Sequence, residues 1–203
     1  YKRQGLHMAN KIITISREFG SGGRFIGEEV AKKLGMKYYD KDIISQIAEK
    51  LGFSKEYISQ NAELSPKKGL FAYALTGRDT TGKSVEDMVY EAQRKVILEI
   101  AENDSCVIIG RNADYILKDR TDVINIFIHA DMPEKVKRIC RLYNVTETEA
   151  VAMTADIDKR RMTNYRYYTD QKWGMARNYT LTLNSSQLGY DMCEKIIMEC
   201  AQQ

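Results

Sequence analysis

Cysteine and histidine are scarce in this sequence, and no two cysteines have the spacing of a metal site. The chain has 203 residues, with two histidines and four cysteines at positions 106, 140, 193 and 200. No C-x-x-C pair occurs, so the sequence favours neither a zinc site nor a disulfide framework. Scattered single cysteines fit a reducing compartment, and we expect a cytoplasmic protein whose side chains form no metal site of their own.

Long hydrophobic runs are also missing. No segment approaches the length that spans a membrane, and we find no internal repeat, so a membrane is not an expected partner. The leader YKRQGLHM, residues 1–8, has no apolar stretch long enough for a signal peptide, and we interpret it as an expression-tag remnant before a natural start at Met8. Residues 9–203 are expected to form a single domain.

Neither sign of charge is in large excess. Lys and Arg total 31, Asp and Glu total 28, and the formal net charge is +3. Such a mild balance gives no case for a nucleic-acid partner from charge alone, and phosphorylated small molecules suit it equally well. Hydrophobic residues make up 43% of the chain, which is enough for one sizeable core.

Short apolar runs alternate along the chain with segments of helical period. We predict strands at 11–16, 36–40, 106–110, 123–130 and 180–184, and helices over 23–35, 43–51, 84–100, after Asp131, after Thr146 and from about Leu188. Asp131 with Pro133 and Glu134, and Thr146 with Glu149, are typical of capped helix starts. The alternation predicts an α/β fold with a mostly parallel sheet, which binds ligands at the carboxyl ends of its strands.

Two glycine-rich stretches compete for the role of phosphate-binding loop. GRDTTGKS, residues 77–84, fits the pattern G-x-x-x-x-G-K-[ST] letter for letter, but it follows a polar, loop-like region, and Ser84 with Asp87 equally predicts a helix cap. REFGSGGRF, residues 17–25, lacks the lysine but joins a strand directly to a helix, the context in which backbone N–H groups cradle phosphate. We therefore predict that 17–25 holds phosphate and that GRDTTGKS is a turn and helix cap.

Three longer stretches resemble one known family. They are TISREFGSGGRFIGEEVAKKLGMKYYDKD, VIIGRNADYIL and DKRRMTNYRYYTDQKWGMARNYTLTLNSSQLG. Together they resemble the cytidylate kinase-like family, a branch of the nucleoside monophosphate kinases. The resemblance implies a three-layer P-loop NTPase-type fold, a helical monophosphate-binding insertion over 52–83 and a lid over about 137–178. It also implies transfer of the γ-phosphoryl group of ATP, with Mg2+, to a nucleoside monophosphate such as CMP or dCMP.

The loop departs from that family's usual pattern. Monophosphate kinases follow the loop glycines with Lys and then Ser or Thr, whereas Gly23 or Arg24 falls at the lysine and Phe25 at the magnesium-binding hydroxyl. Losing the lysine removes a contact to the β- and γ-phosphates. Arg24 is the expected replacement, although an arginine fork is not geometrically equivalent to an ammonium group, which leaves turnover open.

The positions of residues at strand ends, together with the resemblance, identify the candidate site residues. The phosphates of ATP are assigned to Arg17, Gly20, Ser21, Gly22, Gly23 and Arg24; catalysis to Arg24, Arg138 and Arg161; and substrate contacts to Asp40, Arg111, Asp158 and Arg161. Asn112 and Asp114 are weaker candidates beside Arg111. Asp40 has a second interpretation as a helix cap.

Two other functions remain open at this point. Arginines and tyrosines interleave between 137 and 178, as in proteins that stack bases and follow a phosphate backbone, so a non-catalytic nucleotide- or nucleic-acid-binding protein is the main rival. The second alternative function is that of a small-molecule kinase with a different phosphate acceptor. The resemblance over nearly the whole chain favours a kinase, with a small nucleotide as partner and no nucleic acid. The sequence does not predict an oligomeric state.

Overall fold

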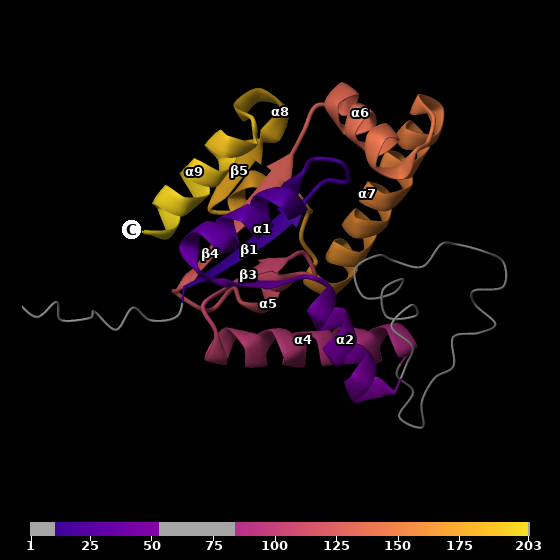
Figure 1. Ribbon diagram of the computed structural model, residues 1–203. Coiled ribbons are helices and arrows are strands. Elements are labelled where there is room, and N and C mark those ends of the chain that lie inside the picture. The colour runs from indigo at the N-terminus through magenta and orange to yellow at the C-terminus, as the bar shows by residue number, and fades with distance from the viewer. Residues whose placement is uncertain (1–10, 53–83, 203) are drawn as a thin grey trace, which may run out of the picture.

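The computed structural model describes residues 11–52 and 84–202 (Figure 1). The strands are β1 (Ile12–Arg17), β2 (Lys37–Tyr39), β3 (Cys106–Ile109), β4 (Val123–His129) and β5 (Leu181–Asn184). The helices are α1 (Gly23–Leu34), α2 (Lys41–Leu51), α4 (Val85–Asn103), α5 (Ala113–Ile116), α6 (Met132–Tyr143), α7 (Glu147–Thr169), α8 (Ser185–Leu188) and α9 (Tyr190–Ala201), with a 3-10 helix, η1 (Ala176–Asn178). None of these helices is long and apolar enough to cross a membrane.

All five strands pair in parallel, in the order β2-β3-β1-β4-β5. The central strand β1 is buried over its whole length, because it pairs with β3 on one side and β4 on the other and is covered on both faces. A run as apolar as IITIS is stable only in such a place. The carboxyl ends of β1, β3 and β4 therefore meet at one edge of the sheet.

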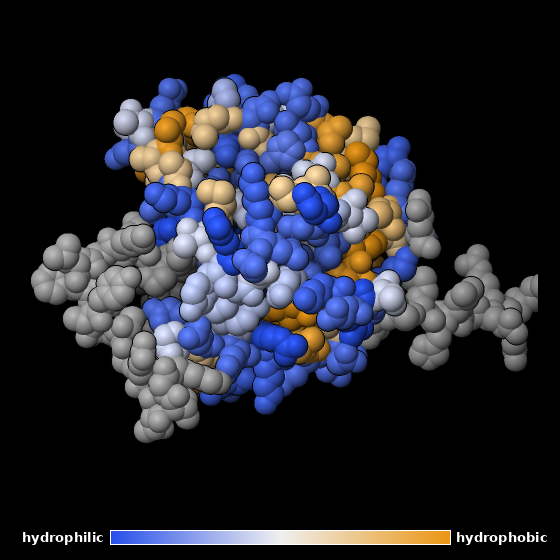
Figure 2. Space-filling view, turned by 180° about the vertical axis from the view of Figure 1, so that it is seen from behind, coloured by the Kyte–Doolittle hydropathy of each residue, from blue (hydrophilic) through white to orange (hydrophobic). Residues whose placement is uncertain are grey.

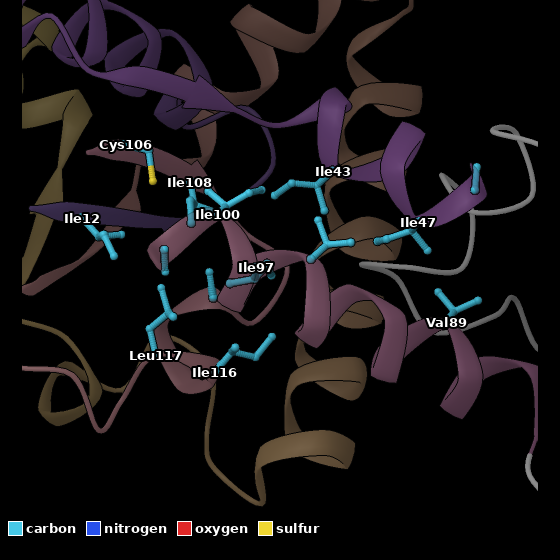
Figure 3. Close-up of a cluster of buried hydrophobic side chains, with 14 residues drawn as sticks. Ile12, Ile43, Ile47, Val89, Ile97, Ile100, Cys106, Ile108, Ile116 and Leu117 are labelled. Atoms are coloured by element: carbon cyan, nitrogen blue, oxygen red, sulfur yellow. The ribbon is translucent and has the colours of Figure 1, made fainter. Parts of the chain in front are cut away.

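The sheet separates two hydrophobic cores, which makes three layers. Side chains alternate along β1, so Ile12 joins one core and Ile13 joins the other. The first core packs β1 and β3 against α2, α4 and α5 (Figure 3). The second core packs the opposite face against α1 and α9. The predicted α/β class with a P-loop-type three-layer architecture is confirmed.

Three predicted helix starts are confirmed, although one lacks its side-chain cap. The Ser84 side chain caps α4 by accepting from the N–H of Asp87, and Thr146 and Glu149 form the predicted capping box of α7. Asp131 occupies the predicted N-cap position of α6, but its carboxylate makes no capping bond. It instead accepts hydrogen bonds from Asn184 Nδ2 at 3.0 Å, at the end of β5, and from Gln187 Nε2 at 2.6 Å, in α8.

Other differences concern short elements. Helix α5 and the 3-10 helix η1 were not predicted, because four and three residues are too few for a helical period to register. The predicted helix from about Leu188 is two helices, α8 and α9, separated by Gly189 with φ 74°. The insertion over 52–83, with most of GRDTTGKS, lies outside the described residues except for Gly52, which ends α2.

Helices α6 and α7 pack against each other beyond the carboxyl ends of the strands (Figure 1). The far half of α7 is attached to α5 and its N-cap residue by two buried hydrogen bonds. Tyr165 Oη donates to Asp114 Oδ2 at 2.7 Å, and Asn112 Nδ2 donates to Asn164 Oδ1 at 3.1 Å. From behind, hydrophilic side chains cover most of the visible face, with smaller hydrophobic areas between them (Figure 2).

Asp114 should make stability depend on pH. Burial raises the pKa of this carboxyl group to about 6, whereas an unfolded aspartate titrates near ~3.9. Between these values the native state holds a proton that the unfolded chain has lost, so the stability of the wild type relative to Asp114→Asn should fall by up to roughly 3 kcal/mol as pH rises. Urea unfolding from about pH 4 to pH 7 measures this.

The matched control is Asp191→Asn, which removes an exposed carboxylate from α9. Its unfolding free energy should follow the wild type across the same range. Parallel curves for the wild type and Asp114→Asn would show that Asp114 is not titrating in the folded state.

Candidate nucleotide-binding site

A five-residue loop, 18–22, joins β1 to α1. Gly20 and Gly22 have φ values of 82° and 84°, a left-handed backbone that other residues rarely adopt. Ser21 closes the turn, since its N–H and its Oγ both donate to the carbonyl of Glu18, at 3.2 and 2.8 Å. The loop conformation is therefore fixed by glycines and by its own hydrogen bonds.

The loop opens directly into the first turn of α1. The N–H of Ile26 bonds to the carbonyl of Gly22, so the helix begins at the last loop residue, and its first turn contains no acidic side chain. Unsatisfied N–H groups and the helix dipole make such an end favourable for anions. This geometry suits a phosphate group.

A cavity of about 280 Å³ lies over the loop. It is lined by Arg17, Glu18, Phe19, Gly20, Gly22, Gly23, Arg24, Phe25, Arg138, Ile139, Leu142, Tyr143 and Arg161. Four arginines reach it from four elements: Arg17 from β1, Arg24 from α1, Arg138 from α6 and Arg161 from α7. The cavity therefore combines backbone donors on its floor with cations on its walls.

A second cavity, of about 520 Å³, adjoins the first. It is lined by Gly20, Ser21, Ala130, Glu134, Lys137, Arg138, Arg141, Ser185, Ser186, Gly189 and Tyr190. Arg138 borders both cavities, and its guanidinium carbon lies 4.2 Å from the centre of the Tyr190 ring. Burial, and then the charge of Arg141, lower the pKa of Arg138, which still stays protonated at neutral pH.

Arg24, predicted to replace the missing lysine, is paired with another predicted residue. Its Nη2 lies 2.5 Å from Asp40 Oδ2, and its side chain is 49% exposed while that of Asp40 is 7% exposed. Asp40 occupies the N-cap position of α2, as its second interpretation expected, but its carboxylate makes no capping hydrogen bond. The pair brings the end of β2 to the rim of the phosphate loop.

Asp158 lies against the phosphate loop. Its Oδ1 accepts from the N–H of Phe19 at 2.7 Å, and its Oδ2 lies 3.4 Å from Lys135 Nζ. Lys135 Nζ also donates to Glu18 Oε2 at 3.0 Å. Burial raises the pKa of Asp158, and Lys135 and Arg161 oppose that rise. The network connects α6, α7 and the loop through one buried cation and two partly buried carboxylates.

Lys135 is the functional candidate that sequence reasoning missed. It is 5% exposed and belongs to the inward face of α6 together with Val136 and Ile139. A lysine within the apolar stripe of an amphipathic helix is unusual, because a buried ammonium needs a charged partner. That position relative to Val136 and Ile139 is the sequence signal that could have identified it.

A narrow cavity lies at the carboxyl ends of β1 and β3. It is lined by Ser16, Arg17, Gly110, Arg111, Asn112, Arg161 and Trp173. Arg111, predicted from its place after a strand, is buried there, and its carbonyl accepts from Gln93 Nε2 at 2.8 Å. Arg17 and Arg161 line this cavity and the one over the loop, so the structure brings the predicted phosphate and substrate residues together.

The backbone around Arg111 is strained. Gly110, Arg111 and Asn112 have φ values of 64°, 64° and 55°, three left-handed residues in succession. A left-handed residue other than glycine costs about 1 kcal/mol or more. Such strain is retained where packing over-determines it, and here it directs Arg111 into the narrow cavity.

Most predicted residues therefore gather around one connected region. Arg17, Gly20, Gly22, Gly23, Arg24, Arg138 and Arg161 line the cavity over the loop, and Ser21 lines its neighbour. Asp40 and Asp158 are held at its edges by Arg24 and Lys135. Among residues 11–52 and 84–202, no group of three or more His, Cys, Asp or Glu side chains is placed to hold a metal ion.

Comparison with solved structures agrees with this fold. An uncharacterized protein from Eubacterium ventriosum superposes with a TM-score of 0.73 at 25% identity, covering 95% of this chain and 99% of that one. Shikimate kinase from Bacteroides thetaiotaomicron gives 0.54 at 15% identity, over 95% of this chain and 99% of its own. At that identity the likeness concerns the fold, which is that of the P-loop kinases.

Comparison of sequences identifies the family. A cytidylate kinase from Archaeoglobus fulgidus is 25% identical over 195 residues, which is 94% of each chain. The model of the cytidylate kinase-like family matches residues 12–187, a span that includes the phosphate loop, the strained turn after β3 and the serines after β5. The chain belongs to the cytidylate kinase-like family.

Proposed function

We propose that this protein transfers the γ-phosphoryl group of ATP to a nucleoside monophosphate, with CMP or dCMP as the first candidates. One observation carries the proposal: the glycine loop and the open end of α1 form the floor of a cavity whose walls present Arg17, Arg138 and Arg161. Phosphoryl transfer needs positioning and charge neutralisation above all, and this arrangement offers both.

ATP fits the two larger cavities. The loop residues Gly20 to Arg24 and the N-terminus of α1 would hold its phosphates, because backbone N–H groups and the helix dipole converge there. The adjoining cavity would hold the base, where the planar guanidinium of Arg138 and the ring of Tyr190 offer stacking surfaces. Magnesium, entering with ATP, would neutralise charge on the β- and γ-oxygens.

The acceptor phosphate would lie at the entrance of the narrow cavity, whose enclosed volume of about 10 Å³ is only that of a water molecule. Arg111 and Arg161 line it, and Arg161 also lines the cavity over the loop, so it would contact the group in transfer. Arginine forks bind phosphate oxygens in pairs. Asp40 and Asp158, each held by a cation at the edge of the site, are the proposed acceptors of hydrogen bonds from the sugar or base.

The direct test is ADP release from Mg-ATP against a panel of nucleoside monophosphates and a no-acceptor blank. CMP or dCMP should give turnover on the order of 1 to 100 s⁻¹, as in other kinases. Lys83→Ala, which removes the lysine of GRDTTGKS, should leave turnover unchanged, because the loop at 18–22 is proposed to hold the phosphates.

Three other outcomes are informative. Turnover with a different small molecule would keep the kinase and replace the acceptor. Loss of turnover in Lys83→Ala would show that the wrong glycine loop was chosen. No turnover with any acceptor, together with polynucleotide binding that weakens steeply in added salt, would favour the nucleic-acid-binding rival.

Lys135 should be essential to the folded site. Lys135→Met keeps the length of the side chain but leaves the partly buried carboxylates of Glu18 and Asp158 without their shared cation. Breaking such a network should lower the free energy of unfolding by about 3 kcal/mol. Urea unfolding at pH 7 measures the loss.

Lys137→Met is the matched control on the same helix. Lys137 is 72% exposed and pairs with Glu134 on the surface of the helix, so its removal should leave the free energy of unfolding close to that of the wild type. Equal effects of the two substitutions would contradict a special role for Lys135. The triple substitution Lys135→Met, Glu18→Gln, Asp158→Asn should regain stability, because it removes the stranded charges as well.

A further inference from the structure

Compared with the usual P-loop pattern, a cation and a glycine have exchanged positions in this phosphate loop. The pattern G-x-x-x-x-G-K-[ST] places a glycine five residues before the second glycine and a lysine directly after it. With Gly22 as the second glycine, the first position holds Arg17 and the lysine position holds Gly23. The loop therefore lacks the lysine on one side and gains an arginine on the other.

The geometry explains why the two changes occur together. A Cβ at Gly23 would lie 2.6 Å from Arg17 Cβ and 3.0 Å from Arg17 Cγ, closer than atoms can pack. Gly23 is the first residue of α1 and is not among the left-handed glycines, so its backbone does not require glycine. The lack of space requires glycine at this position, because the Arg17 side chain occupies the volume that a side chain at position 23 would need.

Arg17 is held where the loop lysine would act. It ends β1, it is 6% exposed, and its side chain borders both the cavity over the loop and the narrow cavity. Arg161 Nη1 donates to the Arg17 carbonyl at 3.1 Å, which fixes the backbone at this point. Arg17 thus stands between the proposed ATP phosphates and the proposed acceptor phosphate.

Two other cations near the loop are ion-paired with carboxylates. Arg24 is paired with Asp40 and half exposed, and Lys135 lies between the carboxylates of Glu18 and Asp158. Arg24, the replacement expected from sequence, is therefore held at the exposed rim of the loop, whereas Arg17 is buried between the two cavities.

We infer that Arg17 is the catalytic cation that replaces the P-loop lysine at the β- and γ-phosphates of ATP, and that Gly23 lacks a side chain to make room for it. This inference rests on the proposed kinase function. An arginine fork can bind oxygens of both phosphates at once, which suits a group that must hold them through transfer.

A double-mutant cycle tests the exchange. Arg17→Gly removes the cation, Gly23→Lys introduces a lysine into occupied space, and Arg17→Gly with Gly23→Lys rebuilds the ordinary pattern. Each single substitution should lower kcat/KM for ATP by about 100-fold, and the double variant should recover to within about tenfold of the wild type. Lys32→Met, on the exposed side of α1, is the control and should retain wild-type kinetics.

Arg17→Met keeps the inference testable if the glycine variant does not fold. It preserves side-chain length and packing against Gly23 while removing the charge, so kcat/KM should fall about as far as in Arg17→Gly. Circular dichroism and thermal unfolding verify the fold of each variant. Wild-type kinetics in Arg17→Met, or a double variant no better than the worse single one, would overturn the assignment.

Calorimetric titration separates this inference from the proposed function. Arg17→Met should bind ATP about tenfold more weakly than the wild type but bind AMP, which lacks the β- and γ-phosphates, equally well. That result would support Arg17 even if no acceptor gave turnover, in which case the proposed kinase activity alone fails. Equal ATP affinity in the two proteins, or no ATP binding by the wild type, would refute the role of Arg17.

Discussion

The site depends on the close packing of the first turns of α1 against the strands of the sheet. A Cβ at Gly22 would lie 2.6 Å from the Tyr190 ring, one at Gly23 2.6 Å from Arg17 Cβ, and one at Gly27 2.7 Å from Ile109 Cδ1. Gly23 and Gly27 therefore let α1 lie directly on β1 and β3, and Gly22 leaves room for Tyr190 of α9. Its N-terminal N–H groups consequently open at the edge where the strands end, together with the arginines that line the cavities.

Features that are determined by residues close together in the sequence could be predicted. The buried strand 11–16, the loop with Gly20 and Gly22 and the helix behind it follow from apolar period and glycine spacing, and all three are present within a residue or two. The capping box of α7 is likewise local, since Thr146 and Glu149 are three residues apart. Arg111 could be nominated because polar residues after a buried strand reach the ligand edge.

Contacts between distant segments could not be predicted. The Phe19 N–H and Asp158 are 139 residues apart, and only the packing of α7 over the loop joins them. Arg24 was expected to face phosphate, but β2 ends beside it and offers Asp40 instead. Asp131 is the N-cap residue of α6, but its carboxylate bonds to Asn184 at the end of β5 and to Gln187 of α8. In each case a tertiary partner is a better acceptor or donor than the local one.

The charges around the loop have two distinct tasks. Glu18 belongs to the loop and Asp158 accepts from the N–H of Phe19, so their negative charges alone would repel a phosphate bound there. Lys135, placed between them, and Arg161, 3.7 Å from Asp158 Oδ1, balance these two charges, and Lys135 is not part of the lining of the cavity over the loop. The positive potential at the loop is then supplied by cations that do line the cavities, Arg17 among them. A buried lysine on α6 thus allows two carboxylates to organise the loop at little electrostatic cost to a bound phosphate.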